Sequence, residues 1–329
     1  MTPATAGNLK CESLDALEYI QEFYKLDFKD RNELGDELML NQLGYFILDA
    51  RKIDTYVSTP HIANILYKAD KIYLNSSYSY VYSANQGLID AAYSYVYAAL
   101  EALIENNLHL QINMLDIEIN IWNNINYSMK LLSHFTNLKL LYIDGCNCQR
   151  NQQLPNITAH LPESLDALSI VNLPYYNKPF SQNLRTSNLK ILKLMSLKFN
   201  QELRNLPPTL ETLIIESGAF NQPLDNLPCG LKHLIVLCPL FTQHLDNLPH
   251  GLEYFAGLHF NCFVYPEETY NLELVNLPSS IKTIMLDKFL FKKHNEILKE
   301  IYKESTILFY EDFNNFELII NKLLDNKHI

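Results

Sequence analysis

The stretch from residue 205 to residue 252, NLPPTLETLIIESGAFNQPLDNLPCGLKHLIVLCPLFTQHLDNLPHGL, decides the fold because it repeats one pattern. In each copy the triplet Asn-Leu-Pro precedes apolar residues in the spacing Leu-x-x-Leu-x-Leu, and a Phe phrase follows. The first apolar positions, Leu210, Leu231 and Leu252, are 21 residues apart. A fixed period of this length is typical of a stack of similar supersecondary units. The sequence therefore predicts a repeat architecture.

The spacing within one copy predicts a short strand with an extended entry. Leu213 and Ile215 lie two residues apart, so they point to the same side of a strand. Pro207 presets φ and removes a backbone N–H, which suits an extended or turning segment and not a helix. Phe220 would fill the gap between successive turns on the return side. Asn221 could hydrogen-bond the backbone of the adjacent turn, because its amide offers donors and an acceptor.

The same apolar pattern extends in both directions along the chain. The further copies are Ala69/Ile72/Leu74, Ile112/Leu115/Ile117, Leu138/Leu141/Ile143, Leu165/Leu168/Ile170, Leu189/Leu192/Leu194 and Ile281/Ile284/Leu286. The Phe phrase recurs at Phe180, Phe199, Phe220, Phe241 and Phe260. The units before residue 160 are longer, and the connection from Gln86 to Asn106 has apolar residues at helical spacing.

Different patterns flank the repeats. Helical spacing predicts one helix from Ser13 to Tyr24 and a second from Asp36 to Lys52. After Asp287 we expect a helix over Phe291–Lys303, a strand over Ile307–Tyr310 and an amphipathic helix over Phe313–Lys322. Terminal units of a stack must cover an otherwise exposed end of the core, so we interpret this tail as a cap.

The sequence thus predicts an α/β fold, a leucine-rich-repeat-like solenoid with a curved parallel sheet of short strands. The expected regions are a helical N-terminal region (1–58), long degenerate repeats with helical connections (59–159), short repeats (160–288) and a mixed C-terminal cap (289–329).

The phrase F-N-Q-x-L-x-N-L-P-x-x-L-x-x-L-x-I resembles the FNIP repeat, a leucine-rich-repeat relative abundant in amoebae and in the giant DNA viruses that infect them. It is carried by Phe199–Gln201, Phe220–Gln222 and the Asn-Leu-Pro triplets at 205, 226, 247 and 276, and it covers about 161–286. Thr242 and Cys262 depart from the repeat's Asn and Gln. Proteins with these repeats often carry an F-box-like N-terminus, whereas residues 1–58 have no clear Leu-Pro start.

Composition and charge narrow the class of partner. The net charge of −11, without a basic run, argues against nucleic acid, because binding phosphates requires clustered Lys and Arg. No stretch approaches the roughly 18 apolar residues of a membrane span. The six cysteines show no framework spacing and no export signal precedes them, so we expect reduced thiols in a cytoplasmic protein, in the host cytoplasm if the protein is viral.

Few residues suggest chemistry. No phosphate-binding glycine motif occurs, and we expect no cofactor. The candidate metal ligands and nucleophiles are Cys11, Cys146, Cys148, Cys229, Cys238, His233, His244, His250, His259 and Cys262. The Cys-x-Cys pair lacks a second pair, repeat-position histidines are usually surface residues, and no base is paired with a cysteine nucleophile. We therefore predict no metal site, no catalytic residue and no enzyme activity.

The residues between the leucines of each strand should face the concave side of the sheet. The predicted partner-binding residues are Tyr142, Met195, Thr212, Ile214, Glu216, His233, Ile235, Leu237, Tyr254 and Leu258. Large exposed apolar strips mark interaction sites. We therefore expect a scaffold or assembly component that binds a protein partner or a second copy of the chain. Two alternatives stay open: the strip is covered by the chain's own N-terminal helices or insertion, or the protein is an F-box-like substrate receptor of a ubiquitin ligase.

Overall fold

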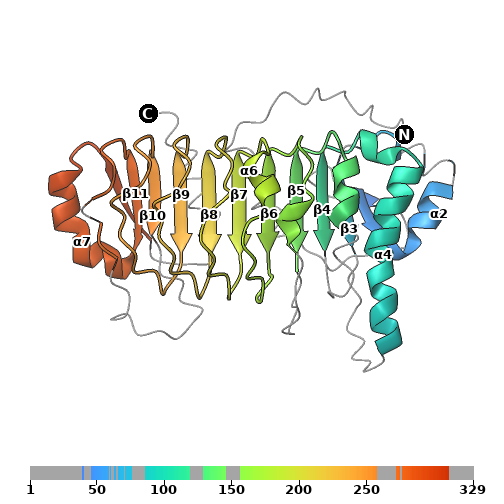
Figure 1. Cartoon of the computed structure of the whole chain (residues 1–329), viewed down its shortest axis with the longest axis horizontal. Helices are drawn as coiled ribbons and strands as arrows, with labels where there is room; N and C mark the ends of the chain where they lie inside the picture. Colours follow the sequence, from blue (N-terminus) through green and yellow to red (C-terminus); the bar gives the residue numbers. More distant parts are fainter. Residues whose placement is uncertain are drawn as a thin grey trace, which may run out of the picture.

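The computed structural model describes residues 39–40, 46–58, 60, 63, 66–69, 71–75, 86–118, 129–145, 156–257, 272–274 and 276–310. These residues contain one 12-stranded sheet in which strand order follows chain order (Figure 1). The strands are β1 Met39–Leu40, β2 Phe46–Asp49, β3 Lys71–Asn75, β4 Met114–Glu118, β5 Leu140–Asp144, β6 Ala167–Val171, β7 Ile191–Met195, β8 Thr212–Glu216, β9 His233–Leu237, β10 Tyr254–Gly257, β11 Thr283–Asp287 and β12 Thr306–Tyr310. The β1–β2 pair is antiparallel and all later pairs are parallel, so the fold is of the α/β type.

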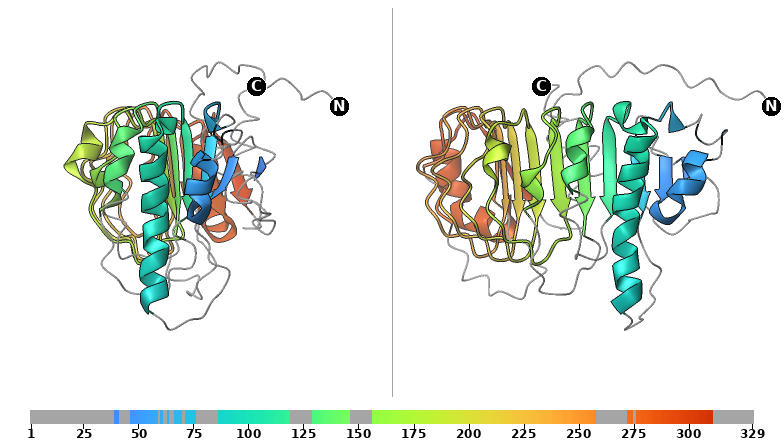
Figure 2. Two further views of the ribbon diagram at one scale, coloured as in Figure 1. Left: turned by 90° about the vertical axis from the view of Figure 1, so that its right-hand side faces the viewer. Right: turned by 45° about the vertical axis from the view of Figure 1, so that its right-hand side comes forward.

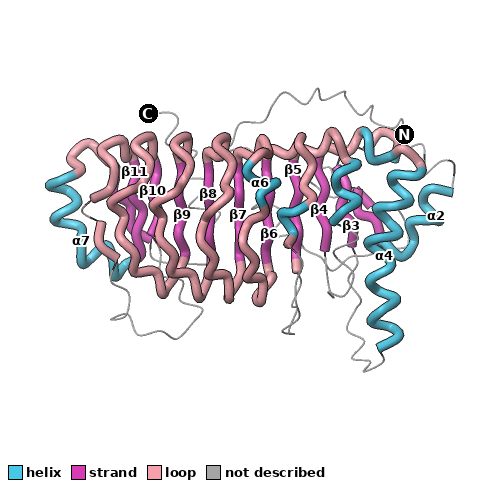
Figure 3. The backbone as a smooth tube through the Cα atoms, viewed as in Figure 1, coloured by secondary structure: helices cyan, strands magenta, loops and turns pink. Residues whose placement is uncertain are grey.

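The helices of the described chain lie in the connections between strands. They are η1 Ala50–Lys52, α2 Ile53–Ser58, α4 Gln86–Glu105, η2 Leu108–Leu110, η3 Leu132–His134, η4 Ile157–Ala159, α6 Gln182–Arg185 and α7 Lys288–Ile301. Figures 1 and 3 show α4, α6 and the return loops of the later strands in front of the strands, and the turned views of Figure 2 place them on the same face.

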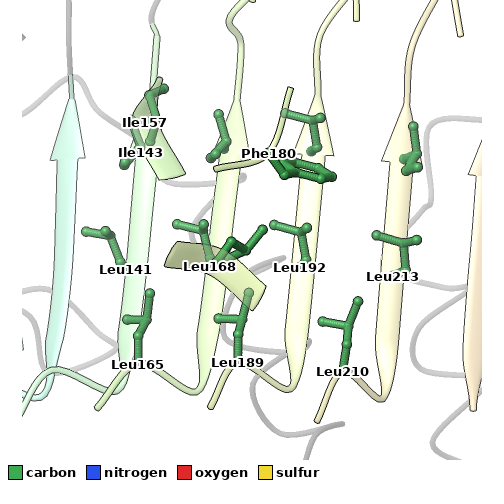
Figure 4. Packing of buried hydrophobic residues seen from close by; sticks show 14 of the residues in the cluster. Leu141, Ile143, Ile157, Leu165, Leu168, Phe180, Leu189, Leu192, Leu210 and Leu213 are labelled. Atoms are coloured by element: carbon green, nitrogen blue, oxygen red, sulfur yellow. The ribbon is translucent and has the colours of Figure 1, made fainter. Parts of the chain in front are cut away.

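Identical repeat positions are neighbours across the sheet. The strand register pairs Leu192 with Leu213 and Leu213 with Leu234. Figure 4 shows such leucines as one row, with Leu210 and its equivalents as a second row beside the strand entries. Leu210 and Leu213 are fully buried in a single core cluster, and burying one such side chain stabilises the fold by about 1.5–3 kcal/mol. The strand register predicted from the leucine spacing is confirmed.

Two further ladders connect the return segments. Phe180, Phe199, Phe220 and Phe241 follow one another with ring centroids 5.6, 6.0 and 5.9 Å apart. The Oδ1 atom of Asn221 accepts hydrogen bonds from the backbone N–H of Thr242 at 3.0 Å and from the next residue's side chain. The Asn ladder expected between turns is therefore present at these positions, whereas Phe260 lies outside the described residues.

A third ladder of alternating charge runs along the residues that immediately precede the strands. Lys232 pairs with Glu211 at 2.8 Å, and Lys282 pairs with Glu253 at 2.9 Å. The hydrogen bond that the Lys232 ammonium donates to the Glu211 carboxylate raises the pKa of Lys232. Exposed pairs of this kind each contribute roughly 0–1 kcal/mol, so the ladder favours the native register more than it stabilises the fold.

The predictions for the flanking regions are partly wrong. The helix expected over Asp36–Lys52 is replaced at β1 and β2 by strands. The run Phe46-Ile47-Leu48 is short and apolar, and such runs do not distinguish a helix from a buried strand. These residues form a strand because pairing with β3 buries Leu48 in the core. The helices expected over 13–24 and 313–322 lie outside the described residues.

The predicted cap elements after the last repeat are present. Helix α7 and strand β12 occupy the expected positions, and β12 extends the sheet beyond β11. The Asp287 carboxylate accepts hydrogen bonds from the backbone N–H groups of Phe289 and Leu290. This cap satisfies two of the free donors at the start of α7, so the repeat pattern stops where the helix begins.

Candidate interaction face of the sheet

The side chains that alternate with the leucines form the opposite side of the sheet, which we call the second face. Strand register arranges them in three rows, one for each outward position of a strand. The first row is Met114, Leu140, Ala167, Ile191, Thr212, His233, Tyr254 and Thr283. The middle row is Asp116, Tyr142, Ser169, Lys193, Ile214, Ile235, Ala256 and Met285. The third row begins with Glu118, Asp144 and Val171 and continues with Met195, Glu216 and Leu237.

The middle row divides the second face into two halves of different chemistry. From β4 to β7 each residue of the row carries a polar group, namely the Asp116 carboxylate, the Tyr142 hydroxyl, the Ser169 hydroxyl and the Lys193 ammonium. From β8 to β11 it carries Ile214 and then three more apolar side chains. Strands lie about 4.8 Å apart, so the apolar half spans about 14 Å across the strands.

The predicted partner-binding residues lie on the expected face, but most of them are not exposed. Ile214 and Leu237 are each 1% exposed, and Tyr142, Thr212 and Ile235 are 0% exposed. The expectation of an exposed apolar strip is therefore wrong for these side chains. The alternative of a covered face agrees with the burial, because side chains on a solvated sheet face would keep a larger share of their surface in water.

Every described helix belongs to the core on the leucine side. Side chains of α2, α4, α6 and α7, and of the short 3-10 helices, contribute to the core cluster. Ile214, Ile235 and Met285 are buried but are not part of that cluster. Within the described ranges, no helix therefore packs against the second face.

A network of polar and aromatic side chains joins β8 to β11 on the second face. The Thr212 hydroxyl lies 3.0 Å from Nδ1 of His233, whose ring contacts Tyr254 edge-on at 6.5 Å between centroids. The Tyr254 hydroxyl donates to Sδ of Met285 at 3.5 Å. Burial raises the pKa of Tyr254, so this phenol stays neutral.

Buried charges distinguish the polar half. Asp116 is 1% exposed, Asp144 is 0% exposed and Lys193 is 3% exposed. The amide of Asn172, held at a φ of 54°, donates to Asp144 at 2.9 Å. Each of the three charged residues takes part in interactions, as expected, because burying an unpaired charge is costly. A segment or partner that packs against this half must therefore carry polar as well as apolar side chains.

Three of the predicted residues are partly open. Met195 and Glu216 pair with each other at the carboxyl ends of β7 and β8, and His233 begins β9. These are the positions on the second face where a substitution can change binding without creating a large defect in a packed interior. Leu258, the last of the predicted residues, lies outside the described residues.

The candidate residues for chemistry are dispersed. Cys229 is exposed, whereas Cys238 is buried and donates to the carbonyl oxygen of Ile215 at 3.5 Å. Burial raises the pKa of the Cys238 thiol, so it stays protonated and unreactive. Among the residues that the structure describes, no group of His, Cys, Asp or Glu side chains is arranged to hold a metal ion. The remaining candidates Cys11, Cys146, Cys148, His259 and Cys262 lie outside the described residues.

Burial of the second face had a signal in the sequence. The segment Leu234–Cys238 is an uninterrupted apolar run, which is typical of strands that are buried on both faces. The leucine period alone assigns alternate residues of that run to the side of the sheet away from the leucines, without indicating that they are buried. The burial of Lys193 had no comparable signal, because a lysine at an outward position is normally solvated.

Comparison with known proteins does not identify a family for this chain. No protein-family model matches the chain, and no curated protein is significantly similar to it. In the described part of the chain, no helix is both long and apolar enough to span a membrane.

Proposed function

We propose that the protein is a non-enzymatic protein–protein interaction module, a leucine-rich-repeat-like solenoid with repeats of the FNIP type, that acts in the cytoplasm. The second face is the binding surface, and its ligand is a helix with apolar and charged side chains on one side. Such a helix lies across the strands from β8 to β11 and reaches the charged residues of β4 to β7 with its far end.

The observation that carries this proposal is the second apolar face of the sheet. The leucine side already accounts for every described helix, yet Ile214, Ile235 and Met285 are buried on the other side. These side chains are already buried within the chain itself, so a partner that contacts them must displace what covers them, and proteins use such apolar surfaces for helix-in-groove recognition. The buried charges of Asp116 and Lys193 add specificity, because the charges of a partner that packs against this half must be complementary to them.

The test compares two charge reversals in the full-length protein. Glu216→Lys alters a half-buried residue of the second face, and Glu202→Lys alters an exposed residue of a return segment. Tagged proteins are used for affinity capture from cytoplasm, and captured proteins are quantified by mass spectrometry after circular dichroism has shown that both variants are folded. We expect Glu216→Lys alone to lose the captured partner. Equal capture by both variants, or equal loss, would contradict the proposal.

A substrate receptor of a ubiquitin ligase is the second candidate. Strand β2 pairs with β3, and Ile53 and Tyr56 of α2 lie in the common core. These residues are therefore part of the sheet domain, and a ligase-recruiting element would have to lie before Met39. The same capture experiment decides this point, because the receptor hypothesis requires a ligase subunit among the captured proteins.

A further inference from the structure

We propose that α7 is a pH-dependent cap on the end of the leucine core, with His294 as its switch. Protonation of the buried His294 ring in mildly acidic solution loosens the contact between α7 and residues 272–274, and the middle of the helix then separates from the last repeat. This inference goes beyond the proposed function, because it concerns the end of the repeat stack and not the second face.

Helix α7 covers the end of the leucine core. Figure 1 shows it at the end of the sheet, beside β11. Leu290 and Leu298 are fully buried and belong to the core cluster together with Leu286 of β11. Because a terminal unit must cover the apolar side of the last turn, detachment of α7 would expose that side to water.

Three attachments hold α7 in place. At its start, the Asp287 carboxylate accepts hydrogen bonds from two backbone N–H groups of the first turn. At its end, the Tyr302 hydroxyl donates to the carbonyl oxygen of Leu277 at 2.8 Å. His294 lies about two helical turns from either end and forms a hydrogen bond with the backbone of Leu272. His294 is therefore the residue that joins the middle of α7 to residues 272–274.

The His294 imidazole is enclosed by apolar side chains. The residue is 8% exposed, and among the described residues its Nε2 atom is buried without a hydrogen-bond partner. Leu290 and Leu298 lie one turn before and one turn after it on the same side of the helix. A neutral ring fits this environment, whereas a protonated ring carries an N–H on both nitrogens and would bury one of them unpaired. Protonation and packing therefore oppose each other.

Two charged side chains act on the His294 ring. Burial lowers the pKa of His294 and the neighbouring Lys293 lowers it further, whereas the hydrogen bond with Leu272 and the Glu273 carboxylate raise it. Lys293 and Glu273 are both exposed, so water and salt weaken their effects. Burial therefore keeps the ring neutral at pH 7.

The other elements that pack against α7 do not compensate a positive charge on the ring. Strand β11 ends at Asp287, which lies about 10 Å along the helix from His294 and already caps the first turn. Strand β12, Thr306–Tyr310, contains no Asp, Glu, Lys, Arg or His, and its tyrosine is neutral in this pH range. On α7 itself, Lys292 and Glu296 are exposed. Within the described chain, His294 thus has no ion-pair partner that would stabilise its protonated form.

The direction of the pH effect follows from the two states of the cap. A solvated imidazole has a pKa of about 6.5, and opening of the cap restores this value, whereas the packed ring has a lower pKa. Acid therefore stabilises the open cap and not the closed one. Between pH 7.5 and 5.5 the equilibrium constant for opening increases by up to about tenfold, because protonation of the open state multiplies it by about 1.1 at the higher pH and by about 11 at the lower one.

The experiment is amide hydrogen exchange of the full-length protein at pH 7.5 and pH 5.5, mapped by mass spectrometry and corrected for the intrinsic pH dependence of exchange. We expect the protection of α7 and of residues 272–274 to fall by about three- to tenfold at the lower pH. The amides of α7 should be less protected than those of β8 at both pH values, because opening of the cap leaves the central strands paired.

The control variants separate the His294 ring from other sources of pH dependence. His294→Gln and His294→Leu replace the ring by a polar and by an apolar side chain, neither of which titrates. Both variants should abolish the pH dependence in α7, and two are used because a single one can also loosen the packing. His250→Gln changes an exposed histidine and should leave the pH dependence of α7 as in wild type.

Three results would overturn the proposal. A change of less than about twofold in the protection of α7 between the two pH values would show that the ring does not control the cap. A pH dependence that survives in either His294 variant would assign it to another group. Equal protection of α7 and β8 at both pH values would show that the cap opens only when the whole sheet unfolds. Because no partner is present, none of these results affects the affinity-capture test of the proposed function.

Discussion

The adjacent residues Ile214 and Ile215 allow a direct test of whether the second face is a packed interior. They are the same amino acid on the same strand, and they point to opposite faces of the sheet. Ile214 is 1% exposed on the second face, and Ile215 is 0% exposed in the leucine core. Because β8 lies in the middle of the sheet, both side chains have paired neighbours on β7 and β9.

The expected magnitude follows from burial. Truncation of a fully buried isoleucine to alanine costs about 2–5 kcal/mol, through lost transfer free energy and the cavity that remains. The same truncation on a solvated face costs about 1 kcal/mol or less, mostly from strand propensity. We therefore expect Ile214→Ala and Ile215→Ala to lower the free energy of unfolding by similar amounts, each within the larger range.

Urea unfolding of the full-length protein, monitored by circular dichroism, measures the decrease in unfolding free energy for each variant. The m-value must remain equal across wild type and both variants, because repeat proteins can lose cooperativity and then have no single unfolding free energy. A loss below about 1 kcal/mol for Ile214→Ala, beside a large loss for Ile215→Ala, would refute the covered face. It would restore an open strand face as the binding surface.

Three further predictions concern the ladders and the cap. Asn221→Ala removes the acceptor of the exposed Thr242 backbone N–H, and we expect it to lower the unfolding free energy by about 0.5–1.5 kcal/mol in urea titrations. Glu211→Lys replaces the ion pair with Lys232 by a like-charge contact, so we expect it to cost about 1 kcal/mol or less, and the loss measured in urea titrations should shrink in 1 M salt. Burial lowers the pKa of His294, so the unfolded chain takes up a proton first and stability should fall as pH decreases from 7.5 to 5.5. His294→Gln should flatten that pH profile of the urea midpoint, and an unchanged profile would exclude this histidine as its source.

The leucine side of the fold was predictable from sequence because its determinants are local and repeated. The spacing of Leu210, Leu213 and Ile215 specifies strand, direction and period within six residues, and every copy repeats it. Phe220 and Asn221 follow at fixed offsets, so their ladders also follow once the turns stack in register. The order of the strands then needs no further information, because each turn pairs with the next along the chain.

The N-terminal edge was not predictable in the same way. Phe46–Asp49 is apolar enough for a helix or a strand, and only its pairing with β3 selects the strand. Propensity is a weak guide where an unpaired sheet edge offers a row of backbone hydrogen bonds. The contact that decides the conformation comes from residues more than twenty positions away in the sequence.

The sequence by itself determined which side chains lie on each face, because alternation along a strand is a property of the backbone. Only the tertiary structure decided that Ile214, Thr212 and Lys193 are buried on the second face. Burial depends on what packs against a surface, and the alternation of side chains along a strand does not specify that contact. A periodic pattern therefore specifies a sheet and its two faces, whereas the solvent exposure of each face is a property of the folded molecule as a whole.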